Sequence, residues 1–494
     1  MTELPARQGL DATSQDTPHI AIVGGGIAGM SAAYYLQRAA RAAGLEVRTT
    51  LIERDVRLGG KIVTERLGEG GQFVVEGGPD SFVAQKPWAV ELARELGLGD
   101  ELIGSNPLPR TTCVLHRGRP HPLPEGTQLI VPTRLLPFAR TPLLSPLGKL
   151  RVALDLVIPP RAADGDESLA EFIRRRMGAE ALDRLAEPLL AGIHNADCER
   201  QSLLATFPRF RDMERRHGGL IRGALAARRE RERRSSPQSP LAAAPFVTLR
   251  GGVGALVEAL APRLEGDVIT GCGVRRLEHD PTAARAYRLH LDDGRAIEAD
   301  AVVMAAPASV AAGLVAPFQP ELAAALRAIR FVSTATISLA YPREAIRRPL
   351  DGYGVVIPRR ERRRINALTV SSDKFRHRAP EGYALVRAFV GGSRTPEALE
   401  LDDEGLVALA RDELRQILGV EGEPVLARVY RWLNANPQYE VGHLERVDRL
   451  EALCPPGLHL AGCAYRGVGI PDCVRQGREA AERALALVMG RAAV

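Results

Sequence analysis

The chain has 494 residues, with 45% hydrophobic and 4% aromatic content, and it carries 66 basic and 60 acidic residues. This length exceeds what one small core organises, so two or three domains are expected. The slight positive excess is scattered and is not interleaved with aromatic residues, which argues against nucleic-acid binding. The six cysteines contain no C-x-x-C pair and the ten histidines show no metal-ligand spacing. Neither a disulfide framework nor a metal site is therefore predicted.

The first 18 residues are polar and lack the apolar core of a signal peptide. No apolar run reaches the length needed to span a bilayer. We therefore expect a cytoplasmic protein with reduced thiols.

The strongest local pattern lies in residues 19–53. A short apolar run at 20–23, typical of a buried parallel strand, leads directly into the sequence GGGIAG at 24–29. A segment of helical composition follows, and a second apolar strand at 47–52 ends on Glu53. This is a βαβ unit with G-x-G-x-x-G at its first turn, which predicts a dinucleotide site.

Each position in this unit has a chemical task. Gly24 permits the tight turn, Gly26 lets a pyrophosphate approach the backbone, and Gly29 lets the helix pack on the strands. The helix N-terminus supplies free N–H groups and partial positive charge to the phosphates. Glu53 is placed to accept hydrogen bonds from a ribose hydroxyl.

A second glycine pair follows at once, in RDVRLGGK at 54–61. Its backbone donors and the charge of Lys61 extend the phosphate site, which favours FAD over NAD. A strand at 73–76 then leads into the turn GGPDSF at 77–82, which is expected to pass beneath an isoalloxazine ring.

The stretch from 107 to 160 is apolar and rich in proline, with Arg134, Arg140, Lys149 and Arg151 interleaved. Two interpretations stay open for it: a patch that meets a membrane surface, or an ordinary helical subdomain with apolar core faces.

The remaining pattern defines the predicted fold class, which is α/β. At 310–430 the order of predicted strands and helices differs from that of the first domain, and it indicates an antiparallel sheet with helices inserted into that domain. A strand at 458–460, glycine turns at 462 and 467–469, and a long helix from 473 return to the nucleotide site. We expect an FAD-binding Rossmann-like domain with an inserted α+β substrate domain and a helical subdomain. The expected segments are FAD binding at 19–88, 245–306 and 431–490, helical at 89–215 with membrane association left open, and substrate binding at 307–430.

From residue 20 to about residue 487, these pieces together resemble the flavin-dependent porphyrinogen oxidases of the haem pathway, within the wider group of amine oxidases and phytoene desaturases. The narrower similarity lies in GPDSF at 78–82, EPLLAGI at 187–193, ATFPRF at 205–210, RW at 431–432, PQYEVGH at 437–443 and GVGIPDC at 467–473. The chain looks more like bacterial coproporphyrinogen III oxidases than protoporphyrinogen IX oxidases. It departs from the pattern at His194-Asn195-Ala196-Asp197 and at Ala435-Asn436-Pro437. Either departure could alter the wall of the substrate pocket and with it the choice of substrate.

The motifs and the resemblance together predict a non-covalent FAD. The predicted FAD contacts are Gly24, Gly25, Gly26, Ile27, Ala28, Gly29, Glu53, Arg54, Gly60, Lys61, Gly77, Gly78, Pro79, Asp80, Val274, Trp432, Gly462, Gly469, Ile470, Pro471 and Asp472. The resemblance implies that Val274 binds the adenine edge through its backbone and that Lys86 faces substrate propionates. The alternative for Lys86 is a solvated lysine that caps the next helix. His194 could face a ligand or serve as a structural residue.

The resemblance implies an enzyme that uses O2 to oxidise coproporphyrinogen III to coproporphyrin III and releases H2O2. Protoporphyrinogen IX is the alternative substrate, and an amine oxidase is a more distant alternative. No catalytic residue is predicted, because the electron-rich macrocycle demands no strong acid or base. The expected partners are the porphyrinogen and O2, with peripheral contact to the inner face of the cell membrane left open.

Overall fold

The computed structural model describes residues 17–107, 112–233, 241 and 244–492. Its first lobe is built on a parallel sheet in the order β12-β2-β1-β16-β22. These strands are β1 (His19–Val23), β2 (Arg48–Ile52), β12 (Asp267–Ile269), β16 (Ala301–Met304) and β22 (Leu458–Leu460). Three distant parts of the chain thus share one sheet, and every neighbouring pair in it runs parallel.

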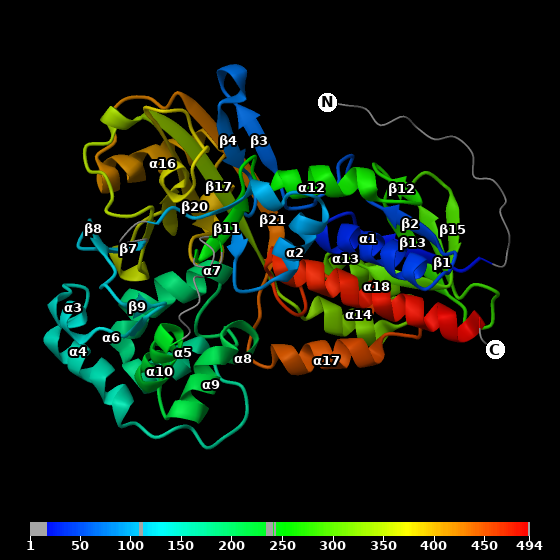
Figure 1. Cartoon of the computed structure of the whole chain (residues 1–494), viewed down its shortest axis with the longest axis horizontal. Helices are drawn as coiled ribbons and strands as arrows, with labels where there is room; N and C mark the ends of the chain where they lie inside the picture. Colours follow the sequence, from blue (N-terminus) through cyan, green and yellow to red (C-terminus); the bar gives the residue numbers. More distant parts are fainter. Residues whose placement is uncertain (1–16, 108–111, 234–240, 242–243, 493–494) are drawn as a thin grey trace.

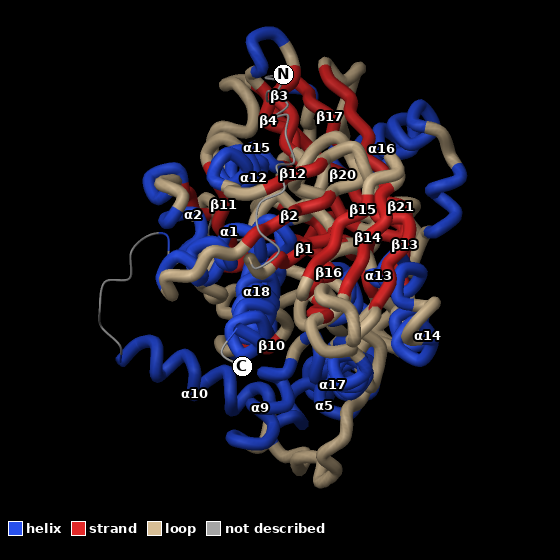
Figure 2. The backbone as a smooth tube through the Cα atoms, turned by 90° about the vertical axis from the view of Figure 1, so that its right-hand side faces the viewer, coloured by secondary structure: helices blue, strands red, loops and turns tan. Residues whose placement is uncertain are grey.

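Two layers cover this sheet (Figures 1 and 2). One core packs α1 (Ile27–Ala42), α2 (Trp88–Glu95), α12 (Gly254–Leu260) and α18 (Ile470–Ala492) against it. The other core holds β13 (Val274–His279), β14 (Tyr287–Leu291), β15 (Ala296–Ala299), α13 (Ala308–Val315), α14 (Pro320–Arg327) and α17 (His443–Leu453). Residues 20–22 of β1 are fully buried between the layers, which explains the unbroken apolar run in the sequence.

The second lobe is a seven-stranded sheet in the order β21-β17-β20-β19-β18-β7-β8. Its strands are β7 (Thr112–His116), β8 (Arg119–Pro122), β17 (Phe331–Pro342), β18 (Gly354–Val356), β19 (Ala367–Val370), β20 (Tyr383–Gly391) and β21 (Leu426–Pro437). All neighbours are antiparallel except β18 and β7. Helix α16 (Asp403–Leu418) packs on this sheet and begins at Asp402, whose carboxylate accepts from the N–H of Gly405.

The third lobe is helical and lies at the lower left of Figure 1. It comprises α3 (Leu135–Arg140), α4 (Pro146–Ala153), η3 (Leu154–Leu156), α5 (Leu169–Met177), α6 (Ala179–Ala181), η4 (Leu182–Ala191), α7 (Gly192–His194), α8 (Leu203–Thr206), α9 (Pro208–His217) and α10 (Leu220–Arg233). Ser168 and Glu171 form a capping box at the start of α5. η4 is a π-helix that contains Pro188, which has no N–H to donate to a regular helical ladder.

The shorter elements connect these lobes. They are β3 (Thr64–Leu67), β4 (Phe73–Glu76), β5 (Phe82–Val83), β6 (Leu102–Gly104), β9 (Thr127–Gln128), β10 (Val131–Pro132), β11 (Phe246–Leu249), α15 (Ser371–Lys374), η1 (Glu69–Gly71), η2 (Gly99–Glu101), η5 (Ala261–Arg263), η6 (Arg343–Ala345), η7 (Arg359–Glu361) and η8 (Pro396–Glu400).

The predicted α/β fold class, with an inserted antiparallel sheet and a helical part, is confirmed. The boundaries of the three lobes do not coincide everywhere with the boundaries of the predicted segments. β7 and β8 lie within the segment 89–215 but extend the seven-stranded sheet, and β21 runs across the expected boundary at 430. In the described part of the chain, no helix has both the length and the apolar character of a membrane span.

Candidate cofactor-binding site

The first glycine turn has the close packing that its spacing predicts. Gly24 follows β1 with φ of +106°, and its N–H donates to the carbonyl oxygen of Ile52 at 2.8 Å. A Cβ on Gly24 would lie 2.8 Å from the backbone of Ala305, and one on Gly29 would lie 1.9 Å from the carbonyl oxygen of Gly24. Larger residues would push helix α1, which carries Ile27 and Ala28, away from the strands.

Gly26 is different, because a Cβ there would meet nothing within 4 Å. Its backbone is extended, with φ of −69°, so the conformation itself does not require glycine. The space in front of the α1 N-terminus is open, and the second glycine pair borders it. The N–H of Gly59 donates to the carbonyl oxygen of Gly25 at 2.8 Å, and a Cβ on Gly60 would lie 3.1 Å from the Cα of Gly26. The two glycine turns are therefore in contact and together border an open space that suits a pyrophosphate.

The carboxylate of Glu53 is fixed at the end of β2. It accepts from the N–H of Gly25 at 2.6 Å and from the N–H of Asp55 at 2.8 Å. The backbone of Glu53 also contacts the turn before β13, where the N–H of Cys272 donates to its carbonyl oxygen at 3.2 Å. The structure thus brings Glu53, the exposed Arg54 and Val274 to one edge of the parallel sheet.

The N-terminal and C-terminal parts of the chain meet at Lys61. Its ammonium donates to the carbonyl oxygen of Ala435 and lies 3.1 Å from the sulfur of Cys463. Cys463 follows Gly462, which has φ of +127°, after β22. The N–H of Cys473 donates to the carbonyl oxygen of Gly469 at 3.0 Å, closing the first turn of α18 at Ile470, Pro471 and Asp472. The predicted flavin contacts near both ends of the chain are therefore neighbours in space.

The turn at residues 77–80 lies against this meeting point. A Cβ on Gly78 would lie 1.8 Å from the carbonyl oxygen of Lys61. The carbonyl oxygen of Gly77 accepts from the indole N–H of Trp432 at 2.9 Å. The buried guanidinium of Arg387 donates to the carbonyl oxygens of Gly77 at 3.0 Å and Gly78 at 2.6 Å. These donors, which belong to β20 and β21, hold the backbone of the turn that contains Pro79.

The pKa values of two carboxylates at this turn, those of the buried Glu76 and the half-buried Asp80, shift in opposite directions. Burial raises the pKa of Glu76 to about 7, against the charge of Arg378 and hydrogen bonds from Thr64 Oγ1 and the N–H of Val253. Burial also acts to raise the pKa of Asp80, but the charges of Lys374 and Arg387 outweigh it and hold that pKa well below its usual range. The Lys374 ammonium lies 2.9 and 3.0 Å from the two oxygens of Asp80. Asp80 thus has a charged partner inside the protein.

Lys86 has a partner that the sequence reasoning missed. Its ammonium donates to both carboxylate oxygens of Asp472, at 2.7 and 2.6 Å. It does not cap α2, whose N-cap is Pro87 without a side-chain hydrogen bond. The predicted substrate residue and a predicted flavin residue therefore form one ion pair.

His194 lies near this pair. Its ring is 5.9 Å from that of Phe207 and 6.4 Å from that of Tyr439. Burial, followed by the charge of Lys86, lowers the pKa of His194 to about 4, so the imidazole is neutral at neutral pH. A neutral ring among aromatic side chains suits an apolar wall.

Sequence reasoning also missed Arg387 and Lys374, and it missed the role of Tyr439 in holding the second glycine turn. Tyr439 donates to the carbonyl oxygen of Cys463 at 2.7 Å and accepts from the N–H of Gly467 at 2.9 Å, so it fixes the second glycine turn. A signal for Arg387 does exist, since it is one arginine in the apolar strand YALVRAFVG. A charged residue within such a strand needs a partner.

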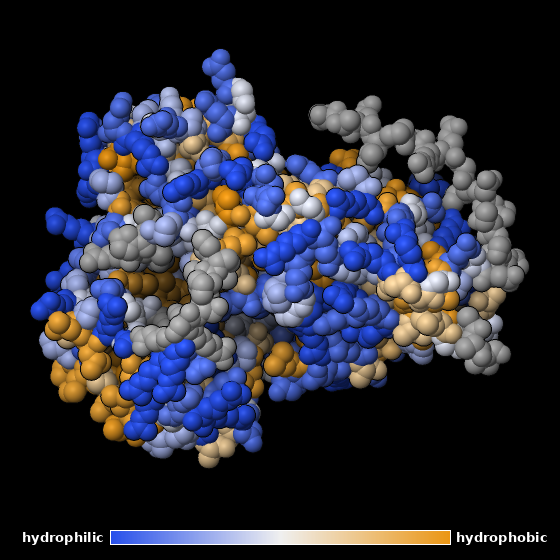
Figure 3. Space-filling model, viewed as in Figure 1, coloured by the Kyte–Doolittle hydropathy of each residue, from blue (hydrophilic) through white to orange (hydrophobic). Residues whose placement is uncertain are grey.

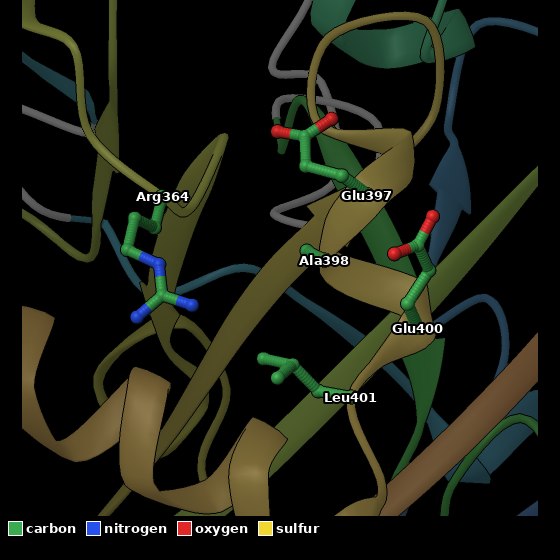
Figure 4. A pocket seen from close by; sticks show the side chains of 5 residues that line it. All are labelled: Arg364, Glu397, Ala398, Glu400 and Leu401. Atoms are coloured by element: carbon green, nitrogen blue, oxygen red, sulfur yellow. The ribbon is translucent and has the colours of Figure 1, made fainter.

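One surface hollow lies apart from the glycine turns, beside η8 (Figure 4). It has a volume of about 360 Å³ and is lined by Arg364, Glu397, Ala398, Glu400 and Leu401. Its two glutamates belong to η8, and its lining includes none of the glycine turns described above. It therefore lacks the backbone donors that a dinucleotide needs.

A parallel sheet whose glycine turns converge on the N-termini of two helices defines a dinucleotide-dependent oxidoreductase fold. Residues 27–485 match the family of flavin containing amine oxidoreductases. The chain belongs to this family, and its cofactor is FAD. The glycine turns and the open space at Gly26 fit that cofactor.

The chain is similar to proteins of known name over nearly its whole length. It is 36% identical over 477 residues to coproporphyrinogen III oxidase of Bacillus subtilis (strain 168), covering 96% of this chain and 99% of the relative. It is 39% identical over 516 residues to coproporphyrinogen III oxidase of Propionibacterium freudenreichii, covering 98% and 94%. A solved structure from Exiguobacterium sp. 255-15, provisionally named protoporphyrinogen oxidase, has a TM-score of 0.82 and 32% identity, covering 95% of this chain and 99% of that one.

Proposed function

We propose that this protein is an FAD-dependent oxidase that converts coproporphyrinogen III to coproporphyrin III with O2. The observation that carries the proposal is the near full-length similarity, at 36% and 39% identity, to two bacterial coproporphyrinogen III oxidases. Chloroplastic protoporphyrinogen oxidase 1 of Arabidopsis thaliana is 31% identical, with 87% of its own length covered. Coproporphyrinogen is therefore favoured over protoporphyrinogen.

The overall reaction removes six electrons and six protons from the macrocycle and reduces three O2 to three H2O2. The bound flavin supplies the hydride-accepting and O2-reducing chemistry. The protein's part is to bind the flavin and the porphyrinogen, to orient them relative to each other, and to exclude water from the site. The α1 N-terminus and the two glycine turns would hold the pyrophosphate of the cofactor. Glu53 would bind the ribose, and the turn that Arg387 and Trp432 hold would position the flavin ring system.

The substrate is an apolar ring with carboxylates at its edge, and the surroundings of the site suit both parts. Figure 3 shows hydrophobic residues in the recess between the lobe of the seven-stranded sheet and the helical lobe. The neutral His194 and Phe207 would add to an apolar wall. The product gains aromaticity, so no protein acid or base is required for the chemical step.

An amine oxidase is less well supported. Such a site would present two tyrosines to the flavin, and the candidates here are Tyr439 and Tyr465. The hydroxyl of Tyr439 already bonds within the glycine turn, and its ring stacks on His443 with centroids 3.8 Å apart. Tyr465 is only 2% exposed.

The test uses the purified yellow protein, O2, and each porphyrinogen separately, with porphyrin fluorescence and H2O2 as readouts. We expect faster turnover of coproporphyrinogen III than of protoporphyrinogen IX, with three H2O2 per porphyrin. Faster turnover of protoporphyrinogen would instead support the alternative substrate, and oxidation of neither would overturn the proposal.

We also propose that the protein is cytoplasmic and contacts an anionic membrane surface through its helical lobe. Six aliphatic side chains on α3, α4 and the residues after them are exposed, namely Leu135, Leu136, Leu147, Leu150, Leu154 and Val157. Figure 3 shows hydrophobic surface at the lower left, where Figure 1 places α3 and α4. Of the interleaved cations, Arg151 turns inward to the carbonyl oxygens at the end of α5, and Arg134 pairs with Glu125. Arg140 and Lys149 supply the remaining attraction to anionic lipid.

The membrane contact is tested by cosedimentation with vesicles of phosphatidylglycerol and phosphatidylcholine. The double variant Leu147→Glu/Leu150→Glu should lose binding, whereas Val425→Glu, at a 55% exposed valine on the sheet lobe, should retain it. No binding of the unmodified protein, or equal binding of both variants, would refute this contact.

A further inference from the structure

The ion pair between Lys86 and Asp472 joins two segments that are far apart in the sequence. Lys86 precedes α2, and Asp472 is the third residue of α18. The side chain of Asp472 is 8% exposed and that of Lys86 is 44% exposed. A second contact joins the same helices, since the guanidinium of Arg475 lies 5.2 Å from the ring centroid of Trp88. The lysine therefore approaches a nearly buried carboxylate in the first turn of α18.

Lys61 belongs to the same electrostatic environment. The thiol of Cys473, next to Asp472, has its pKa raised by burial and by Cys463, while the charges of Lys61 and Lys86 act to lower it. Two lysines and one carboxylate thus surround the N-terminus of α18, which carries a partial positive charge of its own. With Lys86 present this region is net positive, and without it Asp472 would cancel the charge of Lys61.

A positive helix N-terminus beside a flavin favours the reduced form, because reduction adds negative charge to the ring system. We propose that Lys86 neutralises Asp472 and thereby raises the reduction potential of the flavin, instead of anchoring the substrate directly. This inference rests on the flavin part of the proposed function and is independent of which porphyrinogen is used. It explains why the ammonium of Lys86 hydrogen-bonds to both oxygens of Asp472 within the protein.

The test is the midpoint potential of the protein-bound flavin, measured without substrate by equilibration with a reference dye. Lys86→Met should shift the ratio of reduced to oxidised flavin about tenfold toward oxidised, which is about 30 mV for a two-electron couple. Lys86→Met/Asp472→Asn should return the potential to near that of the unmodified protein, since the uncompensated charge is gone. Lys86→Arg should preserve it. Arg475→Met, which removes the other contact between α2 and α18, is the matched control and should leave the potential unchanged.

An unchanged potential in Lys86→Met, with a raised KM for the porphyrinogen that persists in the double variant, would overturn the inference in favour of a substrate anchor. If Lys86→Met loses flavin while the double variant keeps it, charge compensation is supported; equal loss from both refutes it. Failure to oxidise any porphyrinogen would refute the proposed substrate, while the potentials would still decide the role of Lys86.

Discussion

Gly477 of α18 lies directly against Ala28 of α1, so close that a Cβ on Gly477 would be 2.2 Å from the carbonyl oxygen of Ala28. Ala28 is part of the first glycine turn, and Gly477 lies five residues after Asp472 in α18. This close approach of two helices from opposite ends of the chain sets the distance between the two halves of the candidate cofactor site. The contact is with backbone, so a side chain cannot be accommodated by a rotamer change.

Gly477→Ala should therefore destabilise the protein by about 3 kcal/mol, because overpacking at a helix crossing forces backbone shifts. Gly490→Ala in the same helix is the control, since a Cβ there meets nothing within 4 Å. Replacing a helical glycine by alanine in open space stabilises by up to about 1 kcal/mol. Denaturant unfolding followed by circular dichroism should show opposite signs for the two variants, and equal effects would contradict the crossing described here.

Gly26→Val should abolish flavin retention while leaving the fold intact. The backbone of Gly26 is one that valine adopts, and its Cβ would project into open space, so the folded chain itself is not strained. The added methyl groups would occupy the space assigned to the pyrophosphate. Flavin absorbance per mole of purified protein measures the effect. Gly313→Val, at an exposed glycine of α13 that also has open space around it, should keep its flavin. Full flavin content in Gly26→Val would show that the phosphates lie elsewhere.

The glycines of the first turn were predictable because their roles are local. The spacing of Gly24 and Gly29 relative to a strand and a helix dictates their contacts before any tertiary structure is known. The partner of Lys86 was not predictable in this way, since Asp472 lies 386 residues away and nothing in the local pattern links the two. The same limit applies to β7 and β8. Both strands lie in the segment that was expected to be helical, and the sheet they join depends on a parallel pairing of β7 with β18, more than 200 residues later.

Arg387→Met should loosen the turn at residues 77–80. Arg387 is 4% exposed and donates charge-assisted hydrogen bonds to two carbonyl oxygens. Its replacement removes the hydrogen bond to Gly78, whereas the carbonyl oxygen of Gly77 keeps those from Trp432 and Thr336. We expect a loss of about 3 kcal/mol in unfolding free energy and weaker flavin binding. Arg428→Met is the control, because its partner Glu65 is at the surface and such pairs contribute less than about 1 kcal/mol. Unfolding with flavin in fixed excess, and flavin titration of the apoprotein, give the two readouts. Equal effects of both substitutions would show that the turn is held by other groups.

Glu76→Gln should change how stability depends on pH. The pKa of Glu76 is raised from 4.5 to about 7 in the folded protein, with burial as the main cause. The folded state therefore binds this proton more tightly than the unfolded chain, and the stability from that proton is fully present below pH 4.5 and is lost as pH rises through 7. Glutamine mimics the protonated form at every pH. Relative to the unmodified protein, the variant should gain about 3 kcal/mol of unfolding free energy between about pH 4.5 and pH 8.

Asp80→Asn provides the contrast on the same turn. The pKa of Asp80 is lowered in the folded protein, so its contribution is present above the unfolded value of 3.8 and is lost as pH falls. The difference between Asp80→Asn and the unmodified protein should therefore shrink on acidification, while the difference for Glu76→Gln changes mainly between pH 5 and 7. Urea unfolding across the pH range, at constant flavin excess, measures both. Parallel stability curves for Glu76→Gln and the unmodified protein would mean that the pKa of Glu76 is the same in the folded and unfolded chain, so that the charge of Arg378 and the hydrogen bonds fully offset the effect of burial.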